Sequence, residues 1–266
     1  MSMQLQYAGG IFQQIHEEAY GTELDCTLLR QEEHSPEMWS LAGKVWQQRL
    51  QTEYRSVQIL VRFLDDMLGA GDPLDAFVGA SDMVRDEIHH VSLCAALVRG
   101  LGATAMSPNP VQLHAPDAYL KQAPAQRALS TAIAMLAINE TLSEGYIVDL
   151  HRRCQHPVIH EVLTRTLGEE ESHNAFGWTY IEKSLERFPK EVMPGLRELV
   201  KQSLQPHETH ADAVLARIPM DRRNPDSFQD EGFIELGLFS EQRQALIFRQ
   251  TLHETLGPRL RRLGLL

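Results

Sequence analysis

Two short segments of this sequence place a glutamate and a histidine three positions apart: Glu87 with His90, and Glu170 with His173. Residues three apart on an α-helix project from the same face, about one turn from each other. Each pair can therefore offer a carboxylate oxygen and an imidazole nitrogen to one metal ion. In a helix, both segments are therefore potential metal-chelating pairs, and their surroundings decide whether they bind metal.

A single glutamate lies upstream of each pair, Glu53 before the first and Glu140 before the second. Around all six residues, apolar side chains recur at alternating steps of three and four, as in the series Trp46, Leu50, Glu53, Val57. This period is typical of the buried face of a helix. An unpaired carboxylate is costly to bury, so it is normally paired or bound to metal. The six groups are thus predicted to share a partner.

Predicted turns test whether these groups can meet. The break at residues 69–73 lies near the midpoint between Glu53 and Glu87, and the break at residues 155–157 lies near the midpoint of the second glutamate interval. A helix that reverses at its midpoint brings both glutamates to the same height in an antiparallel hairpin. We therefore expect two hairpins that deliver their ligands to one level.

The first hairpin is expected to contain helices at residues 36–68, after the N-cap Ser35, and at residues 73–101. Residues 102–124 contain four prolines and read as an extended connection: Pro108, Pro110, Pro116 and Pro124. At about 3.3 Å per residue this segment could span ~75 Å, more than the roughly 40 Å of a bundle helix. It is therefore long enough to start the third helix parallel to the second.

With this order of groups, residues 39–185 resemble the ferritin-like di-iron carboxylate superfamily, in particular its oxidases and oxygenases. The resemblance implies an all-α, ferritin-like four-helix bundle with one long crossover between helices 2 and 3. It also implies two metal ions held by six ligands, with two glutamates bridging and two terminal. The bridging residues would be Glu87 and Glu170, the terminal ones Glu53 and Glu140, and the histidines His90 and His173.

The resemblance further implies that Asp86 and Glu169, each next to a bridging glutamate, accept a hydrogen bond from the histidine of the opposite hairpin. Metal-bound imidazoles generally need such an acceptor. A site of four carboxylates and two imidazoles suits iron or manganese better than zinc or copper. The expected cofactors are two Fe ions, with Mn an alternative at one or both positions, and O2 as co-substrate.

Several neighbouring residues offer alternatives. Glu144 lies one turn after Glu140 and could replace or assist it as a ligand. His89 forms a second acidic pair with Asp86, rotated away from the apolar face. A further pair, His207 with His210, has ligand-like spacing but lacks carboxylates on a clear apolar face, so it is interpreted as a surface feature.

The chain divides into residues 1–35 as an N-terminal extension, 36–187 as the bundle with its dinuclear site, and 188–266 as a helical C-terminal extension packing on the bundle. Within the extension, helices are expected at residues 190–204, 206–218 and 240–256, the last capped by Ser240. Residues 231–239 are apolar and could cover the bundle, form a dimer contact or close over a substrate pocket.

Composition limits the classes of function. The chain has 266 residues, 43% of them hydrophobic, and a net charge of −11, which argues against nucleic acid as a partner. Neither a membrane span nor a signal peptide is expected, and three scattered cysteines favour the cytoplasm.

The expected activity is that of a non-haem di-iron oxidoreductase that activates O2 to oxidise a small organic substrate. An electron donor and a second copy of the chain, in a homodimer, are the possible partners. The alternative is a ferroxidase, or an iron-storage or detoxification protein, without an organic substrate.

Overall fold

The computed structural model describes residues 3–109, 114–230 and 232–266 of the chain. Within these ranges the protein is all-α, as predicted: it contains helices and connecting loops, and its sole β-pairing is an isolated bridge between Gln4 and Met106. Two residues singled out in the sequence, Pro110 and Glu231, lie outside the described ranges.

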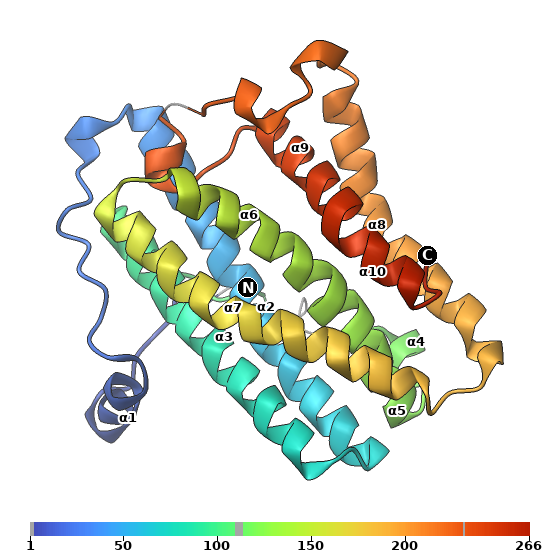
Figure 1. The fold of residues 1–266 in the computed structure, drawn as a ribbon. Helices are drawn as coiled ribbons and strands as arrows, with labels where there is room; N and C mark the ends of the chain where they lie inside the picture. Colours follow the sequence, from blue (N-terminus) through green and yellow to red (C-terminus); the bar gives the residue numbers. More distant parts are fainter. Residues whose placement is uncertain (1–2, 110–113, 231) are drawn as a thin grey trace.

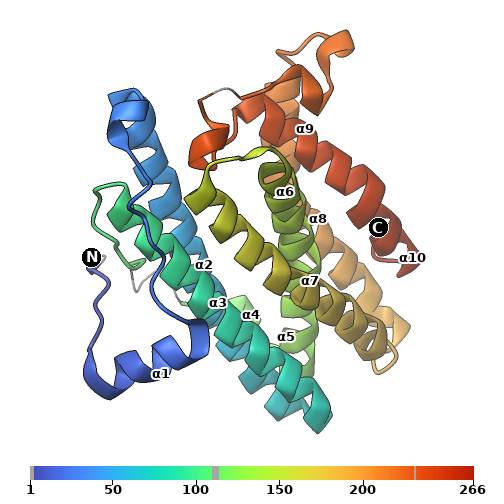
Figure 2. The same cartoon turned by 60° about the vertical axis from the view of Figure 1, so that its left-hand side comes forward.

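The first hairpin consists of α2 (Pro36–Ala70) and α3 (Leu74–Gly100), which lie side by side along most of their length (Figures 1 and 2). The side chain of Ser35 accepts a hydrogen bond of 3.2 Å from the backbone N–H of Met38, as an N-cap does. Gly71 ends α2 with φ 70°, a left-handed conformation that glycine adopts without a steric penalty. The helix start and the predicted reversal are thus both present.

The second hairpin pairs a composite helical stretch with α7 (Pro157–Leu185). The stretch comprises α5 (Pro124–Thr131), a π-helical segment Ala132–Asn139, and α6 (Glu140–Arg153). The sequence predicted a regular α-helix here, so the π-helical segment is a difference. It lies directly before Glu140 and faces Gly177 of α7, where an added Cβ would meet Leu136 Cβ at 2.5 Å.

The connection between the hairpins follows α2 from one end toward the other. Near its start, the backbone N–H of Met106 donates to Gln47 at 2.9 Å. Near its end, α4 (Asp117–Leu120) brings the Tyr119 hydroxyl to Asp66, where it donates at 2.6 Å. The composite stretch therefore begins at the end of the hairpin where α3 begins, and it runs in the same direction as α3 (Figure 1).

The four helical stretches of the two hairpins enclose two apolar clusters. One contains Phe63, Met83 and Ile133. The other contains Leu50 and Leu163, together with apolar residues of the C-terminal segment. Along each long helix the chain passes from one cluster to the other, and the predicted ligands lie near this change.

The C-terminal part consists mainly of α8 (Met193–Leu215), α9 (Glu241–Thr251), a π-helical segment Leu252–Leu256 and α10 (Gly257–Arg262). These helices pack on the composite stretch (Figures 1 and 2). The sequence predicted a helix break at Pro206, and this was wrong. Helix α8 continues through Pro206 because Leu204 and Ala211, on either side of it, are both buried against the core, which offsets the lost backbone hydrogen bond.

A short helix, α1 (Gly10–Tyr20), lies against α3, where the Tyr20 hydroxyl donates to the carbonyl of Arg85 at 2.8 Å. Among the described helices, none has the length and apolar character needed to cross a bilayer.

Candidate metal centre

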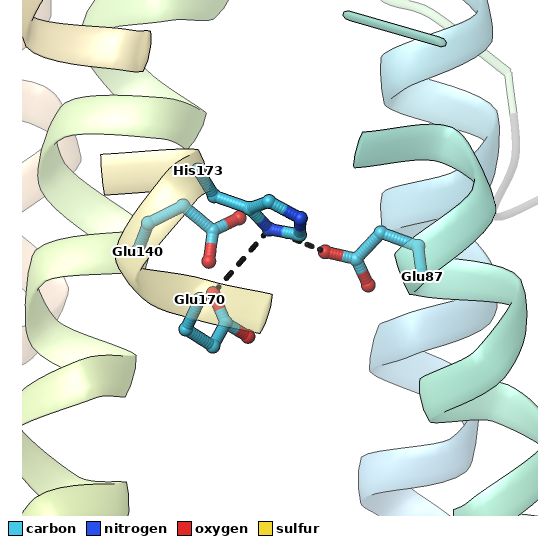
Figure 3. A group of neighbouring side chains, drawn as sticks. All are labelled: Glu87, Glu140, Glu170 and His173. Atoms are coloured by element: carbon cyan, nitrogen blue, oxygen red, sulfur yellow. Dashed lines mark ion pairs between the residues drawn. The ribbon is translucent and has the colours of Figure 1, made fainter. Parts of the chain in front are cut away.

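Six predicted ligands come from four helices and point into the space between the hairpins. They are Glu53 on α2, Glu87 and His90 on α3, Glu140 at the start of α6, and Glu170 and His173 on α7. Two overlapping groups form, and within each one the candidate ligand atoms lie within 4.8 Å of one another. One group is Glu53, Glu87 and His90; the other is Glu87, Glu140, Glu170 and His173, shown in Figure 3.

The two histidines face the same pair of glutamates. His90 Nδ1 lies 3.6 Å from Glu87 and 3.8 Å from Glu170. His173 Nδ1 lies 3.8 Å from Glu87 and 3.5 Å from Glu170. Glu87 and Glu170 therefore occupy the middle of the site, with one imidazole on either side. This is the placement that bridging carboxylates between two cations require.

The other nitrogen of each imidazole contacts an acid on the opposite hairpin. His173 Nε2 hydrogen-bonds to Asp86 at 3.1 Å, and His90 Nε2 lies 2.9 Å from Glu169, close in distance although not aligned as a hydrogen bond. An N–H at Nε2 leaves the lone pair of Nδ1 directed at the central glutamates. The two acids thus hold both rings in the orientation in which they can coordinate metal.

The neighbouring His89 takes no part in either group. Its Nδ1 hydrogen-bonds to Glu169 at 2.8 Å, and its ring stacks on Tyr20 of α1 with ring centroids 4.8 Å apart. The structure therefore places Asp86 and His89 around the site as supporting residues rather than as a ligand pair.

Buried carboxylates elsewhere in the protein show what is unusual here. Asp66 pairs with Arg127, Asp72 with Arg187, and Asp149 with Arg243. The buried Glu87, Glu140 and Glu170 have no such partner: among the described residues, no lysine or arginine lies within ion-pairing distance of them. Burial of adjacent carboxylates without a cation is strongly unfavourable.

Several polar atoms at the centre are also buried without a hydrogen-bond partner within the described ranges. These atoms are Glu87 Oε2, Glu140 Oε1, Glu170 Oε2, His90 Nδ1 and His173 Nδ1. Buried polar atoms in proteins are rarely left unsatisfied. All five are potential metal-ligand atoms and face one space, and four carboxylates would balance the charge of two divalent cations. The residues present therefore fit a dinuclear metal centre.

Without a cation, raised pKa values favour the protonated forms of Glu53, Glu140 and His173. Burial raises the pKa of Glu53 and of Glu140 well above the ordinary glutamate value, and the charges of Glu87 and Glu170 raise both further. Burial alone would lower the pKa of His173, but Asp86 and Glu170 outweigh it and raise the pKa to about 9. Metal binding must displace these protons.

Of the alternative ligands, Glu144 lies apart from both groups and accepts a hydrogen bond from the side chain of Asn174. His207 stacks on Phe248 with ring centroids 5.8 Å apart, and neither it nor His210 belongs to either group. The structure thus brings together the six preferred residues and leaves these three outside.

A cavity of about 780 Å³ reaches the site from the side of Glu53 and His90. The C-terminal segment supplies part of its wall through Phe233, Leu238 and Phe239. This segment is fixed to α2, because the indole N–H of Trp46 donates to the carbonyl of Leu236 at 2.9 Å. Of the three roles that the sequence left open for residues 231–239, the described residues 232–239 cover the bundle, through the buried Ile234, Leu236 and Leu238, and also line this cavity.

Sequence reasoning missed the ion pair that positions this wall. Arg243 of α9 is fully buried and donates two hydrogen bonds to Asp149 of α6, at 2.8 and 2.6 Å, and two to backbone carbonyls. The sequence signal available was Arg243 itself, a charged residue on the apolar face of the predicted last helix. Its partner Asp149 lies 94 positions away, so the pair could not be predicted from local pattern.

Comparisons of this chain with protein-family models, with curated proteins and with solved structures found no match. The assignment of function therefore depends on the geometry of the site.

Proposed function

We propose that this chain is a ferritin-like di-iron carboxylate protein that activates O2 to oxidise a small organic substrate. The observation that carries the proposal is the set of buried glutamates Glu87, Glu140 and Glu170, which lack the arginine partner that every other buried carboxylate of the described chain possesses. Two divalent cations would provide the missing positive charge. The direction of the crossover and the two antiparallel hairpins support a ferritin-like bundle.

The two groups of ligand atoms suggest one position for each ion. Glu53 and His90 would complete the first position and Glu140 and His173 the second, while Glu87 and Glu170 would bridge them. Carboxylate-rich ligand sets favour iron, with manganese an alternative at one or both positions.

Two ferrous ions bound in this way would supply two electrons to O2. The protein itself has simpler tasks. Asp86 accepts the Nε2 proton of His173, and Glu169 lies beside Nε2 of His90, so that both imidazoles keep Nδ1 toward the ions. The apolar clusters on either side exclude water, and the cavity admits substrate next to Glu53 and His90. Insertion of one oxygen atom into a substrate and reduction of the other to water takes two electrons from the substrate and two from the ions. An external donor of two electrons per turnover, which would restore the ferrous state, is therefore part of the proposal.

A ferroxidase or iron-storage role remains the second candidate. The net charge of −11 favours the approach of cations, and the same ligands would bind and oxidise Fe(II). Against it stands the cavity, whose volume of about 780 Å³ lies within the range of binding sites for small organic molecules.

The test is metal analysis of protein expressed with iron, followed by stopped-flow absorption spectra on mixing the Fe(II) protein with O2. We expect two metal ions per chain, and a loss of metal in Glu87→Ala and His173→Ala but not in the exposed α7 control Glu161→Ala. If Glu87→Ala and His173→Ala retain as much metal as the parent, the site assignment is wrong. Oxidation of many Fe(II) ions per chain would favour the ferroxidase.

A further inference from the structure

The cavity beside the proposed metal centre contains one guanidinium group, that of Arg49. Arg49 lies on α2 one turn before Glu53, and both side chains line the cavity. The guanidinium carbon lies 4.4 Å from the centre of the Trp46 ring. Stacking on this buried ring fixes the guanidinium in place at the cavity wall.

Arg49 differs from the other arginines that reach the interior. Arg127, Arg187 and Arg243 each pair with a buried aspartate. Around Arg49, the part of the chain that the structure describes places no carboxylate within ion-pairing distance. Its burial lowers the pKa of the guanidinium, although an arginine stays charged at neutral pH. A half-buried charge of this kind is stabilised by an anion that enters the cavity.

The other polar groups nearby do not supply that anion. Glu53 belongs to the proposed metal centre. Cys94 also lines the cavity, but burial raises the pKa of its thiol well above the ordinary value, so it remains neutral. Glu241 lies at the exposed rim, where it faces Arg217 at 3.9 Å. Since Arg49 is the single guanidinium that lines the cavity, it balances one negative charge, and a singly charged ligand group is favoured over a dianion.

The remaining wall combines neutral polar side chains, such as Ser143, Thr166 and Gln244, with a group of apolar and aromatic ones. It includes Ile147 and Tyr146 of α6, Leu163 of α7, and Phe239 of the C-terminal segment. Tyr146 and Phe239 pack edge to face with ring centroids 5.8 Å apart. The apolar part of the wall can bury a hydrocarbon body, while the single guanidinium fixes the orientation of that body.

We propose that the cavity binds an organic monocarboxylate, with its carboxylate on Arg49 and its apolar body against the α6, α7 and C-terminal wall. This inference rests on the proposed function in one respect: it identifies the bound acid as the substrate class of the metal centre. Planar guanidinium and carboxylate groups form paired hydrogen bonds, and stacking on Trp46 leaves the edge of the guanidinium available for them.

The experiment is isothermal titration of the purified, metal-loaded chain with octanoate, octan-1-ol and octylamine, which share one apolar body and differ in head group. The variant is Arg49→Gln. The matched control is Arg55→Gln on the same helix, because Arg55 donates to the carbonyl of Gln51 and does not line the cavity. Octyl phosphate tests the preference for a single charge.

We expect the parent and Arg55→Gln to bind octanoate at least ~10-fold more tightly than octan-1-ol, as a charge-assisted hydrogen bond in a partly buried site allows. Arg49→Gln should lose this preference while its affinity for octan-1-ol stays within about 2-fold, because the apolar wall is unchanged. Unchanged octanoate binding in Arg49→Gln, or tighter binding of octylamine or octyl phosphate than of octanoate in the parent, would overturn the proposal.

Metal content measured on the same samples separates the two proposals. Octanoate binding through Arg49 in protein that holds no metal at the six ligands would leave the cavity inference standing and remove the proposed function. Two metal ions per chain in protein that does not prefer octanoate would leave the proposed metal centre standing and remove the cavity inference.

Discussion

His173 of α7 donates from Nε2 to Asp86 of α3 at 3.1 Å, so that an acid next to the central glutamate of one hairpin orients the imidazole of the other. Asp86→Asn should keep the fold but lower the affinity for metal by about 10- to 100-fold, because the ring loses its charged acceptor. Competition with a metal-binding dye measures this affinity. Asp82→Asn, at an exposed position on the same helix, is the control. Equal affinities in the two variants would show that the contact has no such role.

Glu140 and Glu144 lie one turn apart on α6, but only Glu140 belongs to a cluster of candidate ligand atoms. Glu140→Gln should therefore reduce the metal content below two ions per chain. Glu144→Gln should leave the content unchanged, since Glu144 contacts Asn174 instead. The measurement is metal analysis of both purified variants. The opposite result would exchange the roles of the two residues.

The stability of metal-free protein should fall as pH rises. The pKa of His173 is raised to about 9, so its stabilising contribution is complete below about pH 6.5 and is lost as pH rises through 9. Glu53 and Glu140, with raised pKa values, act in the same direction because the folded state binds more protons than the unfolded chain. Urea unfolding in chelator at pH 6 and pH 9 measures the change. Bound metal should reduce this dependence of stability on pH, since metal coordination replaces the protons on these groups. A metal-free protein that is more stable at pH 9 would contradict this account.

The Arg243–Asp149 ion pair should contribute strongly to folding. Arg243→Met leaves the Asp149 carboxylate with fewer partners in a buried position, and we expect a loss of about 3–5 kcal/mol in the free energy of unfolding. Arg249→Met on the same helix removes a partly exposed pair with Asp212 and should cost below about 1 kcal/mol. Urea denaturation of both variants gives the comparison. Similar losses would show that burial does not govern the contribution.

Gly177 and Gly168 provide a matched pair on α7. An added Cβ at Gly177 would meet Leu136 of the π-helical segment at 2.5 Å, whereas nothing lies within 4 Å of a Cβ at Gly168. Gly177→Ala should destabilise the protein by about 1–3 kcal/mol through overpacking. Gly168→Ala should stabilise it by up to ~1 kcal/mol, because alanine favours the helix. In thermal unfolding, the melting temperature should fall in Gly177→Ala and rise in Gly168→Ala. A change in the same direction in both variants would contradict the close packing at Gly177.

The sequence predicted the helices and the groups they bring together because both depend on local pattern. Glu87 and His90 interrupt an apolar stripe at helical spacing, and the structure buries both. The break after α2 was visible because Gly71 and Pro73 end and restart helices. These signals lie within a few residues, where periodicity and capping are informative.

Other features depend on contacts between distant segments and left no local signal. The run Ala132–Asn139 has the composition of a regular buried helix, and its π-helical geometry accompanies close packing on Gly177. The partner of Arg243 is 94 positions away. Arg49 reads as one of several polar residues on α2 until the C-terminal segment closes the cavity around it.

The link between Trp46 and Leu236 has a consequence for biosynthesis. All six predicted glutamate and histidine ligands emerge from the ribosome before residues 232–239, which line the cavity, have been synthesised. During translation the candidate site is therefore open on that side, and a metal ion would enter by a broad route. Docking of the tail then narrows the entrance, so under the proposed function loading with metal and selection of substrate would be successive events in the life of each molecule.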